Sequence, residues 1–329
     1  MNKILKTTIY IFISAAIITY LLYKADLNKV ILILNEAKPA MLIVGIILSY
    51  GQTIIDAAKW NALLRFKNIC IPFFKLIANQ MVGLFVSSFL PSRYSGDIYR
   101  TYLLSRTSGR PYEIAASVLL QRLSGLFVLG LSGAIGAIVC FFTLKIEVIS
   151  IVVFCTGIAI MACVVILFLT PTKKILMRIE KISILSFVMK KIVKLHDVVF
   201  EYRKNQKLLI KIFSYSLLFY FEAFVIIYTA CLAVDEDVHF IYVMLVMPMI
   251  YLLEALPISL NGHGIREGAF IYFFGEYGLA FEKAFAISII VLFYRLLKCL
   301  SGGLVFALIH VKIEKASLKG AYESTHEKH

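Results

Sequence analysis

The sequence predicts an all-α protein that crosses a membrane many times, built from eight apolar segments in two inverted halves. Three observations predict this class. Hydrophobic residues make up 60% and charged residues 16% of the 329 residues, and the mean hydropathy of +0.87 is well above that of soluble domains. Apolar runs recur along nearly the whole chain, with one long polar interval, residues 171–211. Two of the apolar segments carry the same kind of polar insertion.

The composition excludes several other classes of protein. The polar interval is too short to form a soluble catalytic domain of about 100 residues. The net charge of +14 comes mostly from cations beside apolar runs, a pattern typical of cytoplasmic membrane flanks rather than nucleic-acid binding. The six cysteines form no CxxC pair, and the sequence has no metal-spaced cluster, nucleotide loop or catalytic triad. We therefore expect no metal, no cofactor and no catalytic residue.

Six segments have the roughly 20 apolar residues that a spanning helix needs. They are residues 4–23, 40–58, 113–143, 148–170, 208–233 and 284–310. The first has no small-residue cleavage site at its end, so we expect a retained span rather than a signal peptide. Two more segments, residues 73–107 and 239–276, are interrupted by the polar insertion.

The basic residues predict the orientation of the chain. The interval 171–211 contains eleven lysines and arginines and is therefore expected on the cytoplasmic side of the plasma membrane. Tracing the spans from this anchor places both termini, and the basic stretch from Lys59 to Lys75, on the same side. The segment 73–107 then enters and leaves on the cytoplasmic side, and the segment 239–276 on the outer side. Both become re-entrant hairpins made of broken helices.

This topology makes the whole chain, residues 1–329, a single transmembrane domain with an inverted repeat. Its expected parts are a first half (1–170), a cytoplasmic amphipathic segment (171–207), a second half (208–310) and a cytoplasmic tail (311–329). The amphipathic segment is expected to lie on the cytoplasmic leaflet. In inverted repeats the binding site lies near the midplane, where the broken helices meet.

The two insertions share a proline, a turn of small residues, an acid and arginines. The first runs from Pro91 to Arg100 (PSRYSGDIYR) and the second from Pro257 to Gly268 (PISLNGHGIREG), and each is followed by an apolar helix with one more arginine. The expected turn residues are Pro91, Gly96, Pro257, Gly262 and Gly264. Broken backbone at membrane depth is tolerated only where it is buried in protein or lines a wet cavity.

Five arginines are the candidate site residues: Arg93, Arg100, Arg122, Arg266 and Arg295. Each would cost about 2.5–3.5 kcal/mol at the centre of an isolated membrane helix. One interpretation is that they bind a lipid phosphate, together with free amides at the helix starts near Gly96 and Gly264. The other is that they pair with Asp97 and Glu267 across the two repeats and fix the hairpins in place. With a phosphate bound, these two acids would orient the arginines.

Three further titratable residues lie in apolar surroundings. Glu222 and Glu254 are candidates for a proton that drives transport, and His263 for a proton relay. The alternatives are neutral, hydrogen-bonded core glutamates and an ordinary turn histidine.

At these residues the chain resembles the membrane region of lysylphosphatidylglycerol synthases, a flippase-like integral membrane family found fused to synthetases and alone. The first family motif is matched by Pro91, Gly96, Asp97 and Arg100, with Ser95 in place of a glycine. The second is matched by Leu256, Pro257, Ser259, Gly262, Gly264, Arg266, Glu267 and Gly268, and the later Tyr-Arg helix by Tyr294 and Arg295. Asn261 and His263 depart from the family pattern.

The resemblance implies a fold and a class of function. In fused relatives this region is taken to translocate an aminoacylated phospholipid that a separate soluble domain makes. We expect no such soluble domain here, and hence no transfer of lysine from its tRNA. The resemblance therefore implies a flippase-like transporter with a phospholipid, a glycolipid or a polyprenyl phosphate as substrate.

Two alternatives remain open at this point. The protein is a non-transporting membrane partner that presents lipid to a glycosyltransferase or another envelope biosynthesis enzyme, with residues 171–211 as the docking surface. Otherwise it is a membrane-embedded transferase of the phosphatidylglycerol lysyltransferase type that uses Glu254 or His263.

Overall fold

The computed structural model describes residues 3–90, 94–143, 147–169, 186–256, 259 and 262–326, and all regular structure in them is α-helical. The helices are α1 (Lys3–Lys24), α2 (Leu27–Asn35), α3 (Pro39–Phe66), α4 (Phe73–Phe89), α5 (Ser95–Ser108), α6 (Pro111–Thr143), α7 (Glu147–Leu169), α9 (Ser186–Tyr202), α10 (Gln206–Ala233), α11 (Phe240–Ala255), α12 (Ile265–Glu276) and α13 (Phe281–His326). The predicted all-α class is confirmed.

Among the described residues, five helices are long and apolar enough to cross a membrane: α3, α6, α7 up to Phe168, α10 and the part of α13 up to Leu308. The protein is therefore a multi-pass membrane protein. In α1, the predicted first span, side chains are described from Phe12 onward, and Phe12–Lys24 is an apolar helix shorter than a full span. The backbone of α13 continues as a helix to His326, past the predicted end of the last span at 310.

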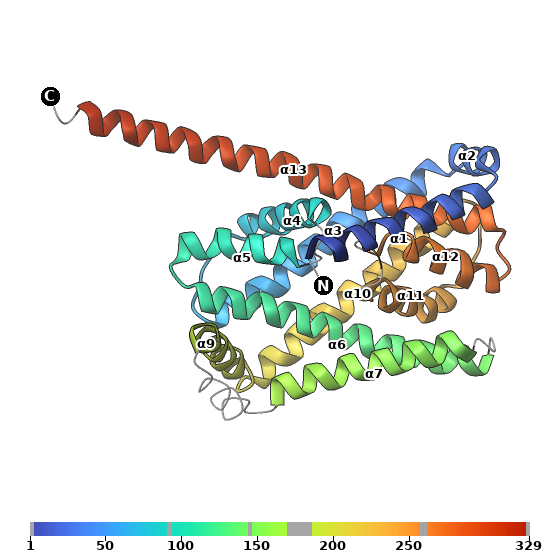
Figure 1. The fold of residues 1–329 in the computed structure, drawn as a ribbon, viewed down its shortest axis with the longest axis horizontal. Helices are drawn as coiled ribbons and strands as arrows, with labels where there is room; N and C mark the ends of the chain where they lie inside the picture. The colour runs from blue at the N-terminus through green and yellow to red at the C-terminus, as the bar shows by residue number, and fades with distance from the viewer. Residues whose placement is uncertain are drawn as a thin grey trace.

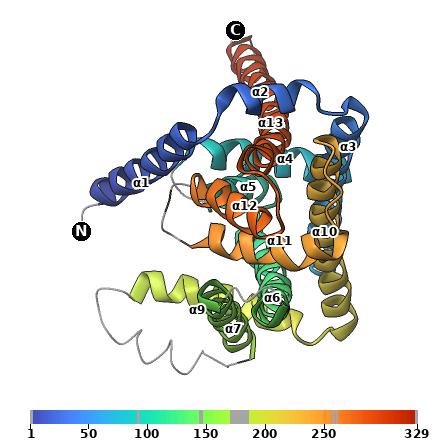
Figure 2. The ribbon, with the colours of Figure 1, turned by 90° about the vertical axis from the view of Figure 1, so that its right-hand side faces the viewer.

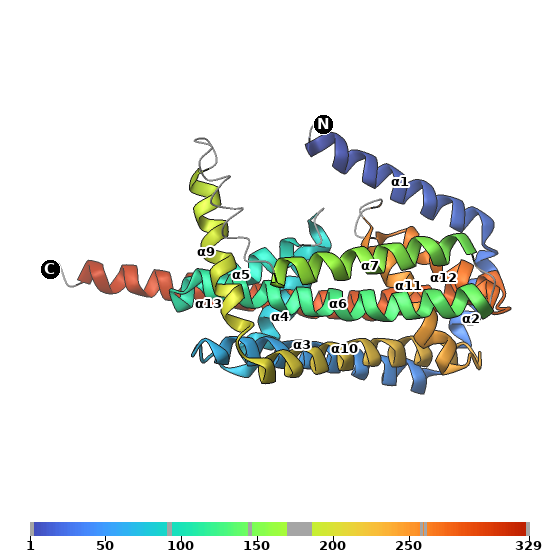
Figure 3. The same ribbon diagram turned by 90° about the horizontal axis from the view of Figure 1, so that it is seen from below.

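The helices α6, α7 and α13 run close to the long axis of the molecule, whereas α3 and α10 are inclined to it (Figures 1 and 3). The helices α3 and α10 lie side by side along one edge, and α6 packs against both α7 and α11. The helix α13 packs on α4. The largest cluster of buried apolar side chains lies mostly on α10, α11, α12 and α13. The short helices α4, α5, α11 and α12 therefore pack among the longer ones.

Each of the two interrupted segments forms a pair of helices. The α4–α5 hairpin opens at the end of the molecule where α6 begins, whereas the α11–α12 hairpin opens at the opposite end, where α13 begins (Figure 1). Both hairpins reach the middle of the bundle (Figure 3). Pro91, Arg93 and Pro257 lie outside the described residues.

Local signals account for several helix ends. Pro39 and Pro111 begin α3 and α6, positions where the missing N–H of proline costs nothing. Asn205 caps α10 by accepting a hydrogen bond from the Leu208 amide at 3.0 Å. Gly109 ends α5 with a φ of +68°, which a residue with a Cβ adopts at a cost.

The helix α9 lies across the axis of the bundle at the end where α5 meets α6 (Figure 3). Its last residue, Tyr202, is fully buried and donates a hydrogen bond to the carbonyl of Leu63 at 3.2 Å. This helix is the described part of the predicted amphipathic segment, of which residues 171–185 lie outside the described residues.

The position of Lys59 differs from the expectation. We expected the span to end near residue 58 and Lys59 to belong to a basic cytoplasmic flank, but α3 continues to Phe66 and Lys59 is buried inside the bundle. The expectation was wrong because a single lysine was taken as the end of an apolar run. A partner one turn earlier, Asp56, lets the helix carry the charge inward: its carboxylate lies 3.4 Å from the Lys59 ammonium.

Candidate functional site

The first hairpin depends on a close contact between two glycines. A Cβ on Gly96 would lie 2.0 Å from the carbonyl oxygen of Gly83, so α4 and α5 touch backbone to backbone at this point. This contact brings Arg100, one turn along α5, against α4 and α3. Gln80 accepts a hydrogen bond from its guanidinium, which also lies over the ring of Trp60 at 4.8 Å. Arg100 is thereby 5% exposed.

Asp97 joins Arg100 to a second arginine. Its carboxylate lies 2.8 Å from the guanidinium of Arg100, three residues along the same helix. Its other oxygen lies 3.5 Å from Nε of Arg122, which comes from α6. The guanidinium of Arg122 also packs over the ring of Tyr94 at 5.1 Å. One acid thus orients two cations from different helices.

The second hairpin holds its arginine in a different way. Gly262 and Gly264 have φ values of +81° and +86° in the turn that leads into α12, a conformation that favours glycine. Glu267 accepts a hydrogen bond from the Gly264 amide at 2.7 Å and so caps the helix. The same carboxylate is paired with Arg266, which is 4% exposed.

The last predicted arginine, Arg295 of α13, pairs with Glu254 of α11 at 3.5 Å. Gly262 makes room for this acid, because a Cβ there would lie 2.2 Å from the Cγ of Glu254. The predicted proton carrier Glu254 therefore lies among the arginines.

The four candidate arginines that the structure describes thus have carboxylate partners, and these ion pairs form within each half of the chain. One of the two interpretations of the sequence was pairing across the two halves, and the ion pairs found for Asp97 and Glu267 do not have that arrangement. The reason is geometric: each acid lies within three residues of an arginine on its own helix.

Three neighbouring cavities lie between the hairpins and the long helices, with volumes of about 240, 360 and 300 Å³. Gln52 of α3 lines all three. Arg100 and Arg122 line the first two, and Arg266 and Arg295 line the third. Glu254 lines the second and third, so neighbouring cavities with shared lining residues extend from the arginines of the first half to those of the second.

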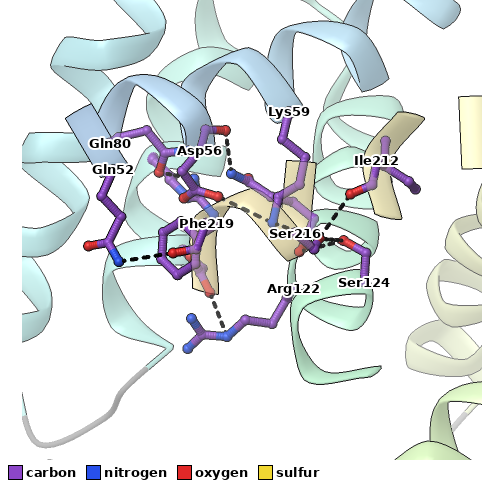
Figure 4. A network of polar contacts seen from close by, with 12 residues as sticks. Gln52, Asp56, Lys59, Gln80, Arg122, Ser124, Ile212, Ser216 and Phe219 are labelled. Carbon is purple, nitrogen blue, oxygen red and sulfur yellow. Dashed lines mark hydrogen bonds and ion pairs between the residues drawn. The ribbon is translucent and has the colours of Figure 1, made fainter. Parts of the chain in front are cut away.

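Sequence reasoning missed several polar residues that line these cavities, among them Gln52, Lys59 and Lys298. Lys59 lies 3.4 Å from the hydroxyl of Ser216 on α10, and this hydroxyl donates to Ser124 on α6 at 3.1 Å (Figure 4). Lys298 of α13 donates to Gln52 at 3.2 Å. The signal that marks the two lysines is a cation inside an apolar helix, the signal that identified the arginines.

The charges around the cavities do not balance. Six lining residues are cations: Lys59, Arg100, Arg122, Arg266, Arg295 and Lys298. Three lining residues are acids, Asp56, Asp97 and Glu254, and Glu267 adds a fourth behind Arg266. Glu222, which interacts electrostatically with Lys298, adds a fifth acid, so one positive charge remains among these residues, which favours an anion in the cavities.

The other predicted proton carriers lie beside this site. Glu222 of α10 is half-buried, and its Oε1 faces Gly51 on α3, where a Cβ would lie 2.5 Å away. His263 is half-buried in the turn before α12. Neither lines the three cavities. Among the residues whose side chains are described, no group of three histidines, cysteines or acids is placed to hold a metal ion.

Comparison with known families matches residues 7–302 to the lysylphosphatidylglycerol synthase TM region. The chain belongs to this family. The match covers both hairpins and all five long spans up to residue 302, so the resemblance in the two motifs extends over nearly the whole membrane region. The protein is an integral membrane member of the lysylphosphatidylglycerol synthase TM family.

Two curated relatives are UPF0104 membrane proteins from archaea. The one from Methanocaldococcus jannaschii is 29% identical over 116 residues, 35% of this chain and 34% of the relative. The one from Pyrococcus horikoshii is 24% identical over 122 residues, 36% of each chain. The chain thus aligns with about a third of the length of these relatives. No solved structure matches the chain.

Proposed function

We propose that this family member is a flippase-like lipid transporter that holds the phosphate of an anionic lipid headgroup among the arginines of its two hairpins. The observation that carries the proposal is the set of adjoining cavities, lined by Arg100 and Arg122 from one half and by Arg266 and Arg295 from the other. Guanidinium groups bind phosphate oxygens through two parallel hydrogen bonds. A headgroup moving between the halves would meet a cation throughout its path.

The carboxylate partners support this mechanism. An arginine left unpaired at membrane depth is costly, and Asp97, Glu267 and Glu254 pair with the arginines when no phosphate is bound. A phosphate that enters would displace these carboxylates from the guanidinium groups, so that each guanidinium is paired with an anion before and after the lipid binds. Such an exchange keeps the difference in free energy between the empty and loaded site small, as a transporter requires.

We also propose that the hairpins are re-entrant, that both termini are cytoplasmic and that the protein resides in the plasma membrane with six spans in an inverted repeat. The opposite openings of the two hairpins and the basic residues near α9 support this orientation. Cys70, exposed between α3 and α4, tests it. A membrane-impermeant maleimide should label Cys70 in inverted vesicles and not in intact cells, and the opposite result would reverse the orientation.

Reconstitution into liposomes tests transport. Fluorescent anionic phospholipid should exchange between leaflets faster with the protein than without it. Arg100→Gln and Arg295→Gln should each slow this exchange roughly ten-fold, because a hydrogen bond between charged groups contributes about 1.5–3 kcal/mol. The matched control is Arg106→Gln, since Arg106 is exposed on the last turn of α5 and lines none of the three cavities.

Folding of each variant is checked by its melting temperature, so that loss of exchange is not mistaken for loss of the fold. Two variants are used because substitution of the buried Arg100 can disturb the fold. The Arg295 side chain is 29% exposed and tolerates substitution better. Equal exchange rates in wild type, Arg295→Gln and Arg106→Gln would refute the phosphate site.

A further inference from the structure

One face of the first hairpin is exposed although it lies beside the arginine cavities. Tyr94, Ile98 and Tyr102 follow each other at intervals of four residues along α5 and are 57%, 68% and 57% exposed. Residues spaced by four lie on one side of a helix. The same side ends at Arg106 in the last turn, roughly 18 Å from Tyr94 at 1.5 Å per residue.

Arg122 of α6 extends this face and connects it to the interior. Its side chain is 40% exposed, and Leu119, one turn earlier, is 38% exposed. Tyr94 and Arg122 both line the cavity of about 360 Å³ that also contains Arg100 and Glu254. The face is therefore apolar along α5 and leads, at Arg122, into the charged cavity.

At the second hairpin, α1 packs against the start of α12. A Cβ on Gly264 would lie 3.0 Å from Ile17 of α1, and Ser14 is buried in this contact region. Arg266, at the start of α12, is correspondingly almost inaccessible. Figure 2 shows α1 on the side of α12, projecting away from the rest of the bundle. The two inverted hairpins thus differ in what covers them.

We propose that the face formed by Tyr94, Ile98, Tyr102, Leu119 and Arg122 is a lateral portal for a phosphate-bearing membrane lipid. This inference rests on the proposed transport function and names the route by which the lipid reaches the site. The lipid phosphate meets Arg122 at the mouth of the cavity, while the acyl chains stay in the bilayer along the apolar side of α5. At the second hairpin α1 lies against the start of α12, next to Arg266.

The portal fits a lipid rather than a soluble phosphate ester. A soluble ester has no apolar part to cover Ile98 and Tyr102, whereas the acyl chains of a lipid would lie against both.

Site-specific photo-crosslinking tests the portal. The full chain carrying Ile98→p-benzoylphenylalanine is placed in vesicles of phosphatidylglycerol and the phosphate-free digalactosyl diacylglycerol in equal parts. The matched control carries the probe at Ile151, an equally apolar and 53% exposed position on α7. We expect phosphatidylglycerol to be enriched about five-fold among the lipids crosslinked at Ile98 relative to Ile151, the effect of one cation near a lipid phosphate.

Second-site variants connect the enrichment to Arg122. It should fall to the level at Ile151 in Arg122→Gln and persist in the charge-retaining Arg122→Lys. Excess glycerol 1-phosphate should leave it unchanged, because the soluble ester lacks the chains that the face accommodates. Equal crosslinking at Ile98 and Ile151, an unaltered ratio in Arg122→Gln, or displacement by glycerol 1-phosphate would overturn the portal.

Leaflet exchange measured in the same vesicles separates the two proposals. Exchange without enrichment at Ile98 would reject the portal and leave transport standing. Enrichment without exchange would reject transport and leave a lipid-binding face.

Discussion

Replacing Gly96 with alanine should separate the two helices of the first hairpin. The new Cβ would lie 2.0 Å from the carbonyl oxygen and 2.7 Å from the carbonyl carbon of Gly83, far inside the 3.5–4.0 Å or so at which carbon atoms attract. Neither atom is the end of a flexible side chain, so α5 must move away from α4. Overpacking costs about 1–3 kcal/mol, and we expect the upper end because backbone must shift. Helix propensity returns up to about 1 kcal/mol, leaving a loss near 2 kcal/mol.

The single tryptophan of the chain provides the assay. Trp60 is fully buried, and the guanidinium of Arg100 lies over its ring, so its fluorescence reports whether α5 stays packed on α3. Denaturant unfolding of the purified protein in detergent should show a lower midpoint for Gly96→Ala. The matched control is Gly268→Ala on α12, where a Cβ meets nothing within 4 Å and should be neutral or stabilising. A Gly96→Ala protein as stable as Gly268→Ala would refute the backbone contact.

Two further substitutions test ion pairs, one inside the bundle and one in an exposed loop. Asp97→Asn removes the carboxylate that Arg100 and Arg122 share. The free energy of unfolding should fall by an amount between the roughly 1 kcal/mol typical of an exposed ion pair and the roughly 3–5 kcal/mol typical of a buried one. The same substitution should tighten the binding of anionic lipid to the purified protein. Unfolding midpoints and lipid titration measure both, and weaker lipid binding would contradict the exchange mechanism. In the α10–α11 loop, a hydrogen bond from Lys38 holds the pKa of the Asp235 carboxyl below its ordinary value of 3.8. The stability that this pair contributes is present above the pKa of Asp235 in the unfolded chain and is lost as the pH falls through its lower pKa in the folded protein. The melting temperatures of wild type and Asp235→Asn should therefore differ at neutral pH and converge below about pH 4. Asparagine tolerates the positive φ of this residue, and a difference independent of pH would exclude the ion pair as its cause.

The interruptions and the arginines were accessible to sequence analysis because each is a local exception in an apolar run. Gly96 is required by a backbone contact, and Gly262 and Gly264 by their positive φ values. Both requirements are met by glycine, so they are visible in the sequence. The pairs Asp97 with Arg100 and Arg266 with Glu267 follow from short spacing on one helix. The sequence therefore predicted the residues of the hairpins better than the partners of those residues.

The remaining contacts depend on helices that meet only in the folded protein. Asp97 reaches Arg122 on α6, and Glu254 reaches Arg295 on α13, across 25 and 41 residues of chain respectively, and no local pattern specifies either pair. Lys59 and Lys298 lie on different spans, and only the packing of α3 and α13 around the hairpins turns both toward one set of cavities.

The asymmetry between the hairpins has the same origin. The two insertions look equivalent in sequence, yet α1, which belongs to the first half of the chain, packs against the start of α12 in the second half. A repeat in sequence therefore predicts where two similar sites lie, whereas a helix outside the two hairpins affects how accessible each site is. On this basis, weakening the contact between α1 and α12 should expose the start of the second hairpin without altering the first. Lipid would then gain access to Arg266, and its access to Arg122 would be unchanged.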